Sequence, residues 1–154
     1  MNFVGDTQKF KKTISFFRKK FSNKDFSKLE QIKIKLSKKF DGTCYYPFNS
    51  RKKYRITCEI DQFVNLPEIM EFYIRPKLKN KKTIRTDKEL TTNYEEIMVW
   101  LLGHELFHFF RDTKQIEGKN TQSQANEFGF KCLREFKRNQ SKTKTSTHKM
   151  MTNR

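Results

Sequence analysis

One segment of the chain, residues 94–110, would be apolar on nearly every face if it formed a helix. Its sequence is YEEIMVWLLGHELFHFF, and its longest apolar run, Ile97–Leu102, is far shorter than the ~20 residues that cross a bilayer. A helix without a polar face has to be surrounded by the rest of the protein. The sequence has no internal repeat, so we expect the other elements to pack around this helix as one domain.

Two capping signals place this helix and a second one. Asn93 can accept a backbone hydrogen bond while Glu96 follows three residues later, which is a capping-box pattern. Thr121 and Gln124 repeat the pattern and predict a helix over residues 122–138. Small and apolar residues share one face of this second helix: Ala125, Phe128, Gly129, Cys132, Leu133 and Phe136.

The N-terminal part of the chain predicts a further helix and a strand. Only 34% of the residues are hydrophobic and 16 residues are Phe, so the core must use few, large side chains. Residues 6–21 place Phe10, Ile14, Phe17 and Phe21 on one stripe among lysines, with Asp6 or Thr7 as the cap. Residues 31–37 alternate between apolar and polar side chains, as a strand with one solvated face does.

The middle of the chain predicts more strands. Asp41-Gly42 is a turn signal, and TCYYPF and KYRITCEI then read as two strands with Asn49-Ser50 between them. EIMEFYIRP and KKTIRTDKEL predict a hairpin around the lysine-rich KLKNKK, although EIMEF can also form a short helix. Together these elements predict an α+β fold with a small mixed sheet packed on an N-terminal helix and two further helices.

The N-terminal residues and the cysteines indicate the cellular compartment of the protein. The first residues, MNFVGDTQKFKK, do not form a signal peptide, and three cysteines without a CxxC pair suit buried thiols in a reducing compartment. We therefore expect a cytoplasmic protein without a membrane segment. We assign residues 1–138 to a single domain and residues 139–154 to a disordered basic tail.

The formal net charge is +17, from 34 Lys and Arg against 17 Asp and Glu. Such an excess attracts phosphate backbones, which makes DNA association a candidate property. Lys outnumbers Arg 25 to 9, a bias that is also expected of an AT-rich genome. The charge alone leaves both explanations open.

The central helix contains the pattern HExxH, formed by His104, Glu105 and His108. The i, i+4 spacing places both imidazoles on one helical face, where they can hold one zinc ion with Glu105 beside it as a base for its water. The chain has only three histidines, and burying two of them costs solvation unless a metal or hydrogen bonds compensate. The alternative is a pair of core histidines bonded to backbone or carboxylate groups.

The run from NYEEIMVW to LREFKR, residues 93–138, resembles the two-helix core of zincin metallopeptidases, in particular the short gluzincin-like domains of SprT-like and ImmA/IrrE-like proteins. In those domains a second helix supplies a metal-binding Glu four residues before Asp or Asn. When the pattern AN-x-F is aligned, Ala125, Asn126 and Phe128 match, and the ligand position falls on Gln122. The resemblance implies a zincin-like fold, with Zn²⁺ held by His104, His108 and Gln122.

Gln122 stands where the family pattern has a carboxylate. Its carbonyl oxygen can bind zinc but brings no negative charge, so metal affinity should be lower. Glu127 points away from the inward face of its helix, and His148 in the tail is the other candidate ligand. Asn126 is expected to orient a ligand histidine from the second helix. Gln122 and Asn126 can alternatively cap and bond the preceding loop.

The resemblance implies a zinc-dependent endopeptidase that binds an extended protein or peptide substrate along a sheet edge. Glu105 would take a proton from the metal-bound water and pass it to the leaving amine. A SprT-like role would place the enzyme near nucleic acid, whereas an ImmA-like role would direct it at a repressor. Candidates for oxyanion stabilisation are Tyr45, Tyr46 and Arg111. The alternative function is a catalytically impaired zincin scaffold that binds nucleic acid or protein.

Overall fold

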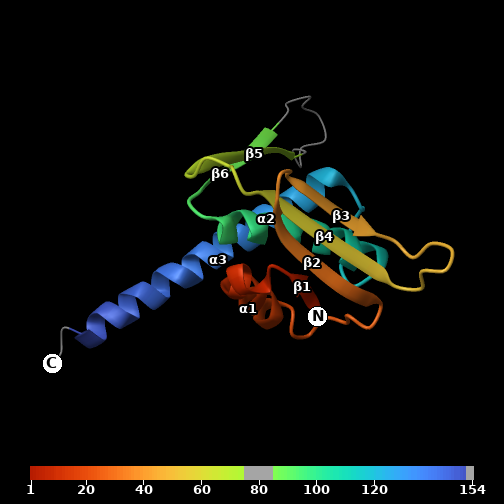
Figure 1. Cartoon of the computed structure of the whole chain (residues 1–154), viewed down its shortest axis with the longest axis horizontal. Coiled ribbons are helices and arrows are strands. Elements are labelled where there is room, and N and C mark those ends of the chain that lie inside the picture. The colour runs from red at the N-terminus through yellow and green to blue at the C-terminus, as the bar shows by residue number, and fades with distance from the viewer. Residues whose placement is uncertain (75–84, 152–154) are drawn as a thin grey trace.

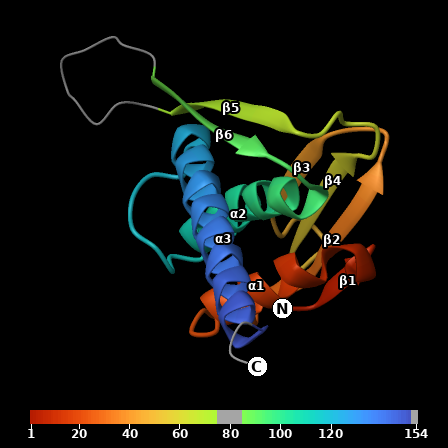
Figure 2. The same ribbon diagram turned by 90° about the vertical axis from the view of Figure 1, so that its left-hand side faces the viewer.

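Helix α2, Tyr94–Asp112, occupies the centre of the structure. The computed structural model describes the backbone of residues 1–74 and 85–151. Helix α2 contacts α1 and the four-stranded sheet and packs most extensively on α3 (Figure 2). Every side chain from Glu96 to Phe110 is buried, which confirms that the apolar segment lies inside the fold. Among the described helices, none has both the length and the apolar character that a membrane span requires.

The start of α2 follows the capping signal with one difference. The backbone N–H of Glu96 donates to Asn93 Oδ1 at 3.0 Å. The Glu96 carboxylate reaches back one residue further than a capping box requires and accepts from the Thr92 N–H at 2.8 Å. Two orphan backbone donors at the helix start are therefore satisfied.

A four-stranded mixed sheet covers one side of α2, with strand order β1-β2-β4-β3. Strands β1 (Phe3–Gly5), β2 (Leu29–Ser37) and β4 (Tyr54–Asp61) run parallel, and β3 (Asp41–Tyr45) pairs antiparallel with β4 at the edge (Figure 1). In β4 buried and partly exposed residues alternate without interruption, as expected for a sheet with one face on the core. The prediction of a small mixed sheet within an α+β fold is confirmed.

The turn predicted at Asp41-Gly42 is wrong. Asp41 and Gly42 are the first residues of β3, where they pair with Glu59 and Cys58 of β4. The chain reverses earlier, at residues 38–40. Glycine is needed at position 42 for space, because a Cβ there would lie 2.5 Å from the Glu105 carboxylate on α2.

Strands β5 (Glu68–Ile74) and β6 (Arg85–Thr91) form the predicted antiparallel hairpin. EIMEF is therefore part of a strand and not a short helix. The KLKNKK segment lies outside the described residues. The hairpin rests on the helices partly through Phe72, whose ring stacks on Trp100 of α2 at 4.0 Å between centroids.

The N-terminal helix consists of a 3-10 turn, Thr7–Phe10, followed by α1, Lys11–Lys20. The predicted phenylalanine stripe is buried. Neither predicted cap forms a side-chain capping bond at the start of the 3-10 turn, because the Asp6 carboxylate accepts from the Leu36 N–H of β2 instead. Asp6 thus ties the entry of this helix to the sheet.

Helix α3, Gln122–Met151, is longer than expected. It continues through residues 139–151, where the sequence predicts a disordered basic tail, and projects from the rest of the fold (Figure 1). No Gly or Pro follows Gly129 in this helix, so the sequence contains no strong stop signal. Gly103 of α2 is a packing glycine, because a Cβ there would lie 3.1 Å from Cys132 and 3.2 Å from Gly129 on α3. All three cysteines are free and buried.

Candidate metal centre

Helix α2 places His104 and His108 one turn apart, with their ring planes inclined at 65° and their ring centroids 5.0 Å apart. Their Nε2 atoms are 3.2 Å apart, and each residue is 8% exposed. With Zn–N bonds of about 2.0–2.1 Å, this separation gives an N–Zn–N angle of roughly 100–105°, close to tetrahedral. The separation of the two nitrogens therefore matches that of two imidazoles bound to one zinc ion.

His108 is held by a side chain that the sequence analysis did not identify. Its Nδ1 lies 2.6 Å from Asn120 Oδ1. An amide oxygen only accepts, so Nδ1 carries the hydrogen and Nε2 keeps its lone pair for a metal. The Asn120 amide donates in turn to the Tyr46 hydroxyl at 3.1 Å. The only sequence signal for Asn120 is its place directly before the helix cap Thr121.

His104 is contacted by the two amides expected to reach it. Gln122 and Asn126 of α3 both form side-chain hydrogen bonds with His104, which raise its pKa. Burial and the neighbouring His108 act in the opposite direction and prevail, so the pKa falls from 6.5 to about 4. His104 is therefore neutral near pH 7 and can offer a lone pair. Its Nδ1 atom is buried without a hydrogen-bond partner among the described residues.

Glu105 lies on the side of the histidines that faces the sheet. Its side chain is 6% exposed, and its Oε1 is 3.9 Å from His104 Nε2. The backbone N–H of Cys44 in β3 hydrogen bonds to the carboxylate. Burial, helped by the charge of Asp41, raises the pKa of Glu105 from 4.5 to about 7, against the lowering effect of the Cys44 bond. A carboxyl group with this pKa can accept and release a proton at neutral pH.

The edge strand β3 borders the candidate site. It lies at the end of the sheet order and is hydrogen bonded to β4. Gly42 and Cys44 of β3 both contact Glu105. An extended peptide that paired with the outer edge of β3 would therefore run past the Glu105 carboxylate.

The other candidates occupy different places. Tyr46 is near the histidines through Asn120, whereas the Arg51 guanidinium lies over the Tyr45 ring. Arg111 donates to the carbonyl of Ile116 in the loop after α2. Of the three candidates for oxyanion stabilisation, the described contacts thus connect only Tyr46 to the histidine pair.

Two alternative ligands are separated from the pair. Glu127 faces away from α2 and pairs with Lys131 on the surface of α3 at 3.2 Å. His148 follows Gln122 by 26 residues in the same helix, which places its backbone about 39 Å further along the axis. Neither residue shares the position that Gln122 and Asn126 occupy beside His104.

The donor set that remains is two imidazoles and the Gln122 amide. Among the side chains that the structure describes, those of residues 1–72 and 86–142, no three His, Cys, Asp or Glu groups lie together in a way that could hold a metal. Comparisons of the chain with protein-family models, with curated proteins and with solved structures found no match. The chemistry of this site is therefore argued from its geometry.

Proposed function

We propose that the protein is a zinc-dependent endopeptidase in which His104, His108 and Gln122 hold the metal and Glu105 is the general base. The observation that carries the proposal is the 3.2 Å separation of the two Nε2 atoms with a buried carboxylate 3.9 Å away. Two neutral imidazoles at this distance, on one helix face, have the spacing of two ligands on one divalent ion. The proposal includes the zincin-like fold that the resemblance implied.

A zinc ion bound here would polarise a peptide carbonyl and lower the pKa of its water toward ~7. Glu105 takes a proton from the attacking water and delivers it to the leaving amine. The Cys44 N–H and the absence of a side chain at Gly42 hold the carboxylate in the position this transfer requires. Asn120 keeps the His108 ring in one tautomer, and Asn126 is a hydrogen-bond partner of His104.

The substrate we propose is an extended protein segment that adds to the edge of β3. Strand addition supplies backbone hydrogen bonds along the substrate and presents its carbonyl groups in sequence to the site. The charge of +17 favours a SprT-like role near nucleic acid. An ImmA-like role, in which the substrate is a repressor, requires no such contact.

The amide at position 122 favours a second candidate function. A neutral ligand in place of a carboxylate leaves more positive charge on the ion and lowers affinity for it. A chain with this substitution could serve as a zincin scaffold that binds nucleic acid or protein without efficient catalysis. Metal content and activity, measured separately, distinguish the two functions.

The test is elemental analysis of protein purified without added metal, followed by a peptidase assay on an unfolded protein substrate. The enzyme proposal predicts one zinc per chain, lost in His104→Ala. It also predicts that Glu105→Gln keeps the metal and loses cleavage. Zinc-free parental protein that cleaves nothing after zinc is added would support the scaffold, and a Glu105→Gln variant of parental activity would remove the base assignment.

A further inference from the structure

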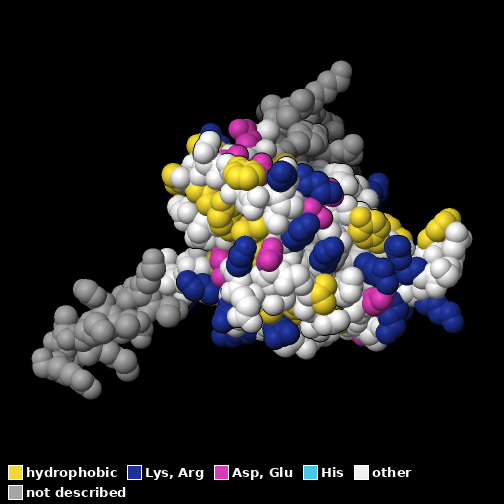
Figure 3. Space-filling view, viewed as in Figure 1, with side chains coloured by type: hydrophobic (Ala, Val, Ile, Leu, Met, Phe, Trp, Pro, Cys, Tyr) yellow, Lys and Arg dark blue, Asp and Glu magenta, His cyan; other side chains and the backbone are white. Residues whose placement is uncertain are grey.

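The connection between β3 and β4 presents exposed aromatic rings. Phe48 is 75% exposed, and Tyr45 and Tyr46 are each 42% exposed. In Figure 3 this end of the molecule shows hydrophobic side chains surrounded by Lys and Arg. Exposed rings of this size, gathered in one segment, usually mark a surface that another molecule covers.

The tip of this connection has a defined backbone conformation. The Arg51 N–H donates to the Phe48 carbonyl at 3.0 Å, and the two residues form an isolated antiparallel bridge. Asn49 between them has φ 50°, a left-handed conformation that asparagine tolerates. The turn therefore pairs the backbones of Phe48 and Arg51 and leaves the Phe48 ring exposed.

The same segment is strongly basic. Residues 45–55 contain four cations, Arg51, Lys52, Lys53 and Arg55, and no Asp or Glu. Arg55 is neutralised by Glu30, with bonds of 2.6 and 2.7 Å. Lys52 and Lys53 are exposed, and Arg51 lies 5.6 Å from the centre of the Tyr45 ring. These cations, Phe48 and the carboxylate of Glu30 are among the residues that line a hollow of about 850 Å³.

We propose that this aromatic-basic loop, residues 45–53, is a binding site for single-stranded nucleic acid. Unpaired bases stack on exposed aromatic rings whatever their sequence, while Lys and Arg neutralise the adjacent phosphates. A duplex hides its base faces, so the rings favour single strands. The Tyr46 hydroxyl joins the loop to Asn120 and His108, and a bound strand would pass beside the metal centre.

An anionic membrane fits this loop less well. Phe48 is followed by Asn49 and Ser50, so a single apolar side chain would have to provide the insertion. One buried Phe contributes only about 1.5–3 kcal/mol, which is marginal for stable anchoring. Stacking on a base uses the Phe48 ring without burying its polar neighbours.

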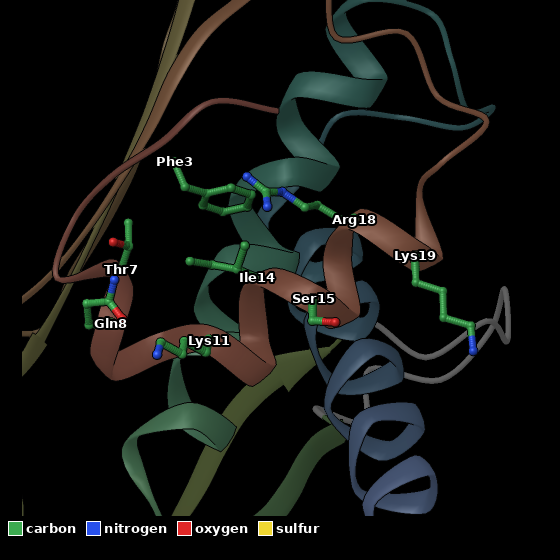
Figure 4. A pocket seen from close by; sticks show the side chains of 8 residues that line it. All are labelled: Phe3, Thr7, Gln8, Lys11, Ile14, Ser15, Arg18 and Lys19. Carbon is green, nitrogen blue, oxygen red and sulfur yellow. The ribbon is translucent and has the colours of Figure 1, made fainter.

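A second basic hollow provides the comparison. It lies between β1 and α1, measures about 680 Å³ and includes Lys11, Arg18 and Lys19 (Figure 4). The guanidinium of Arg18 lies over the Phe3 ring there, 5.7 Å from its centre. This hollow offers positive charge without a freely exposed ring. Variants in this hollow therefore show how much of the binding of nucleic acid comes from charge without stacking.

The experiment measures fluorescence anisotropy of a labelled oligothymidylate of about 15 nucleotides with the full-length protein in EDTA. The inference does not depend on the proposed enzyme, because metal-free protein serves. We expect the single strand to bind more tightly than a duplex of equal length. Phe48→Ala should weaken this binding roughly tenfold, the loss of one stacked base, whereas Phe63→Ala, at a residue 67% exposed elsewhere, should not change it.

The charge contribution is measured by the salt dependence. Lys52→Gln with Lys53→Gln should reduce the slope of log affinity against log salt by about 1.4, since each single-strand phosphate contact contributes about 0.7. Lys11→Gln with Lys19→Gln is the matched control and should leave the slope nearly unchanged. Equal affinity for duplex, no loss in Phe48→Ala, or binding only to vesicles containing anionic phospholipid would overturn the inference.

Discussion

One hydrogen bond joins the Nε2 atoms of His104 and His108. The hydrogen bond from His108 Nδ1 to Asn120 leaves the His108 Nε2 atom as an acceptor. The His104 Nε2 atom, 3.2 Å away, is then the donor. His104 Nδ1 becomes a bare acceptor, which agrees with its burial without a partner among the described residues. A metal that binds both Nε2 atoms has to displace only this one shared hydrogen.

The third ligand is tested by restoring a carboxylate. Gln122→Glu should bind zinc at least tenfold more tightly, because it adds a negative charge beside the ion. Isothermal titration or competition with a chromogenic chelator measures the affinity. Gln124→Glu is the control, since Gln124 is exposed on the same turn of α3 and adds the same charge. Equal affinities for all three proteins would exclude Gln122 from the metal site.

The buried carboxyl group of Glu105 predicts a pH-dependent stability. Its pKa is raised from 4.5 to about 7, so the folded state binds more protons than the unfolded state between these values. Stability contributed by this group is therefore lost as the pH rises from 4.5 to beyond 7. His104, with its pKa lowered from 6.5 to about 4, acts in the opposite direction, and its unfavourable effect develops as the pH falls below 6.5.

Glu105→Gln removes only the first of these two effects. In EDTA, the variant should gain up to about 3 kcal/mol in unfolding free energy over the parent as the pH rises from 5 to 8. Urea unfolding at the two pH values measures the difference. Glu127→Gln, on the surface of α3, is the control and should show no such gain. A difference between Glu105→Gln and the parent that is independent of pH would mean that Glu105 does not titrate in this range.

At the scale of elements, strand β3 packs closely against helix α2 at Gly42. A Cβ at this position would lie 2.5 Å from Glu105 Oε1 and 2.7 Å from a methyl group of Leu101. Gly42→Ala should therefore displace the buried side chains of Glu105 and Leu101 and destabilise the fold by about 1–3 kcal/mol. Chemical denaturation measures this loss.

The control for this prediction is Thr43→Ala, at the next residue of β3. It should change the unfolding free energy much less, because it inserts no atom against α2. In the proposed enzyme, Gly42→Ala should lower kcat while zinc content stays at one per chain, since the histidines lie on the other element. Full activity and stability in Gly42→Ala would show that the strand does not position Glu105.

The sequence predicted elements where one residue pattern controls the local structure. The apolar helix around His104 and the alternating strands β2 and β4 follow directly from periodicity and burial. The prediction of a turn at Asp41-Gly42 was wrong because Gly42 makes room for the side chain of Glu105, which is 63 residues away in the chain. Asn120 was missed for the same reason. Its role depends on a contact with His108 that no local pattern encodes.

At the scale of the whole molecule, one part of α3 contacts the candidate site and another part packs against α2. Its first turns bring Gln122 and Asn126 to His104, and its middle packs Gly129 and Cys132 against α2. Within the part of α3 whose side chains are described, the last buried one is Phe136. The predicted domain boundary at residue 138 therefore lies two residues after the last buried side chain described.

The contribution of the end of α3 to stability is tested by ending the chain after Lys142. The shortened protein should keep its thermal midpoint within about 2 °C of the parent, because it retains every buried side chain described in α3. It should also keep its metal content, because Gln122 and Asn126 remain. Removing α3 from Lys131 onward should instead abolish cooperative unfolding, since Cys132, Leu133 and Phe136 are buried in the core. A large fall in the midpoint after the shorter cut would place part of residues 143–154 among the packing elements of the fold.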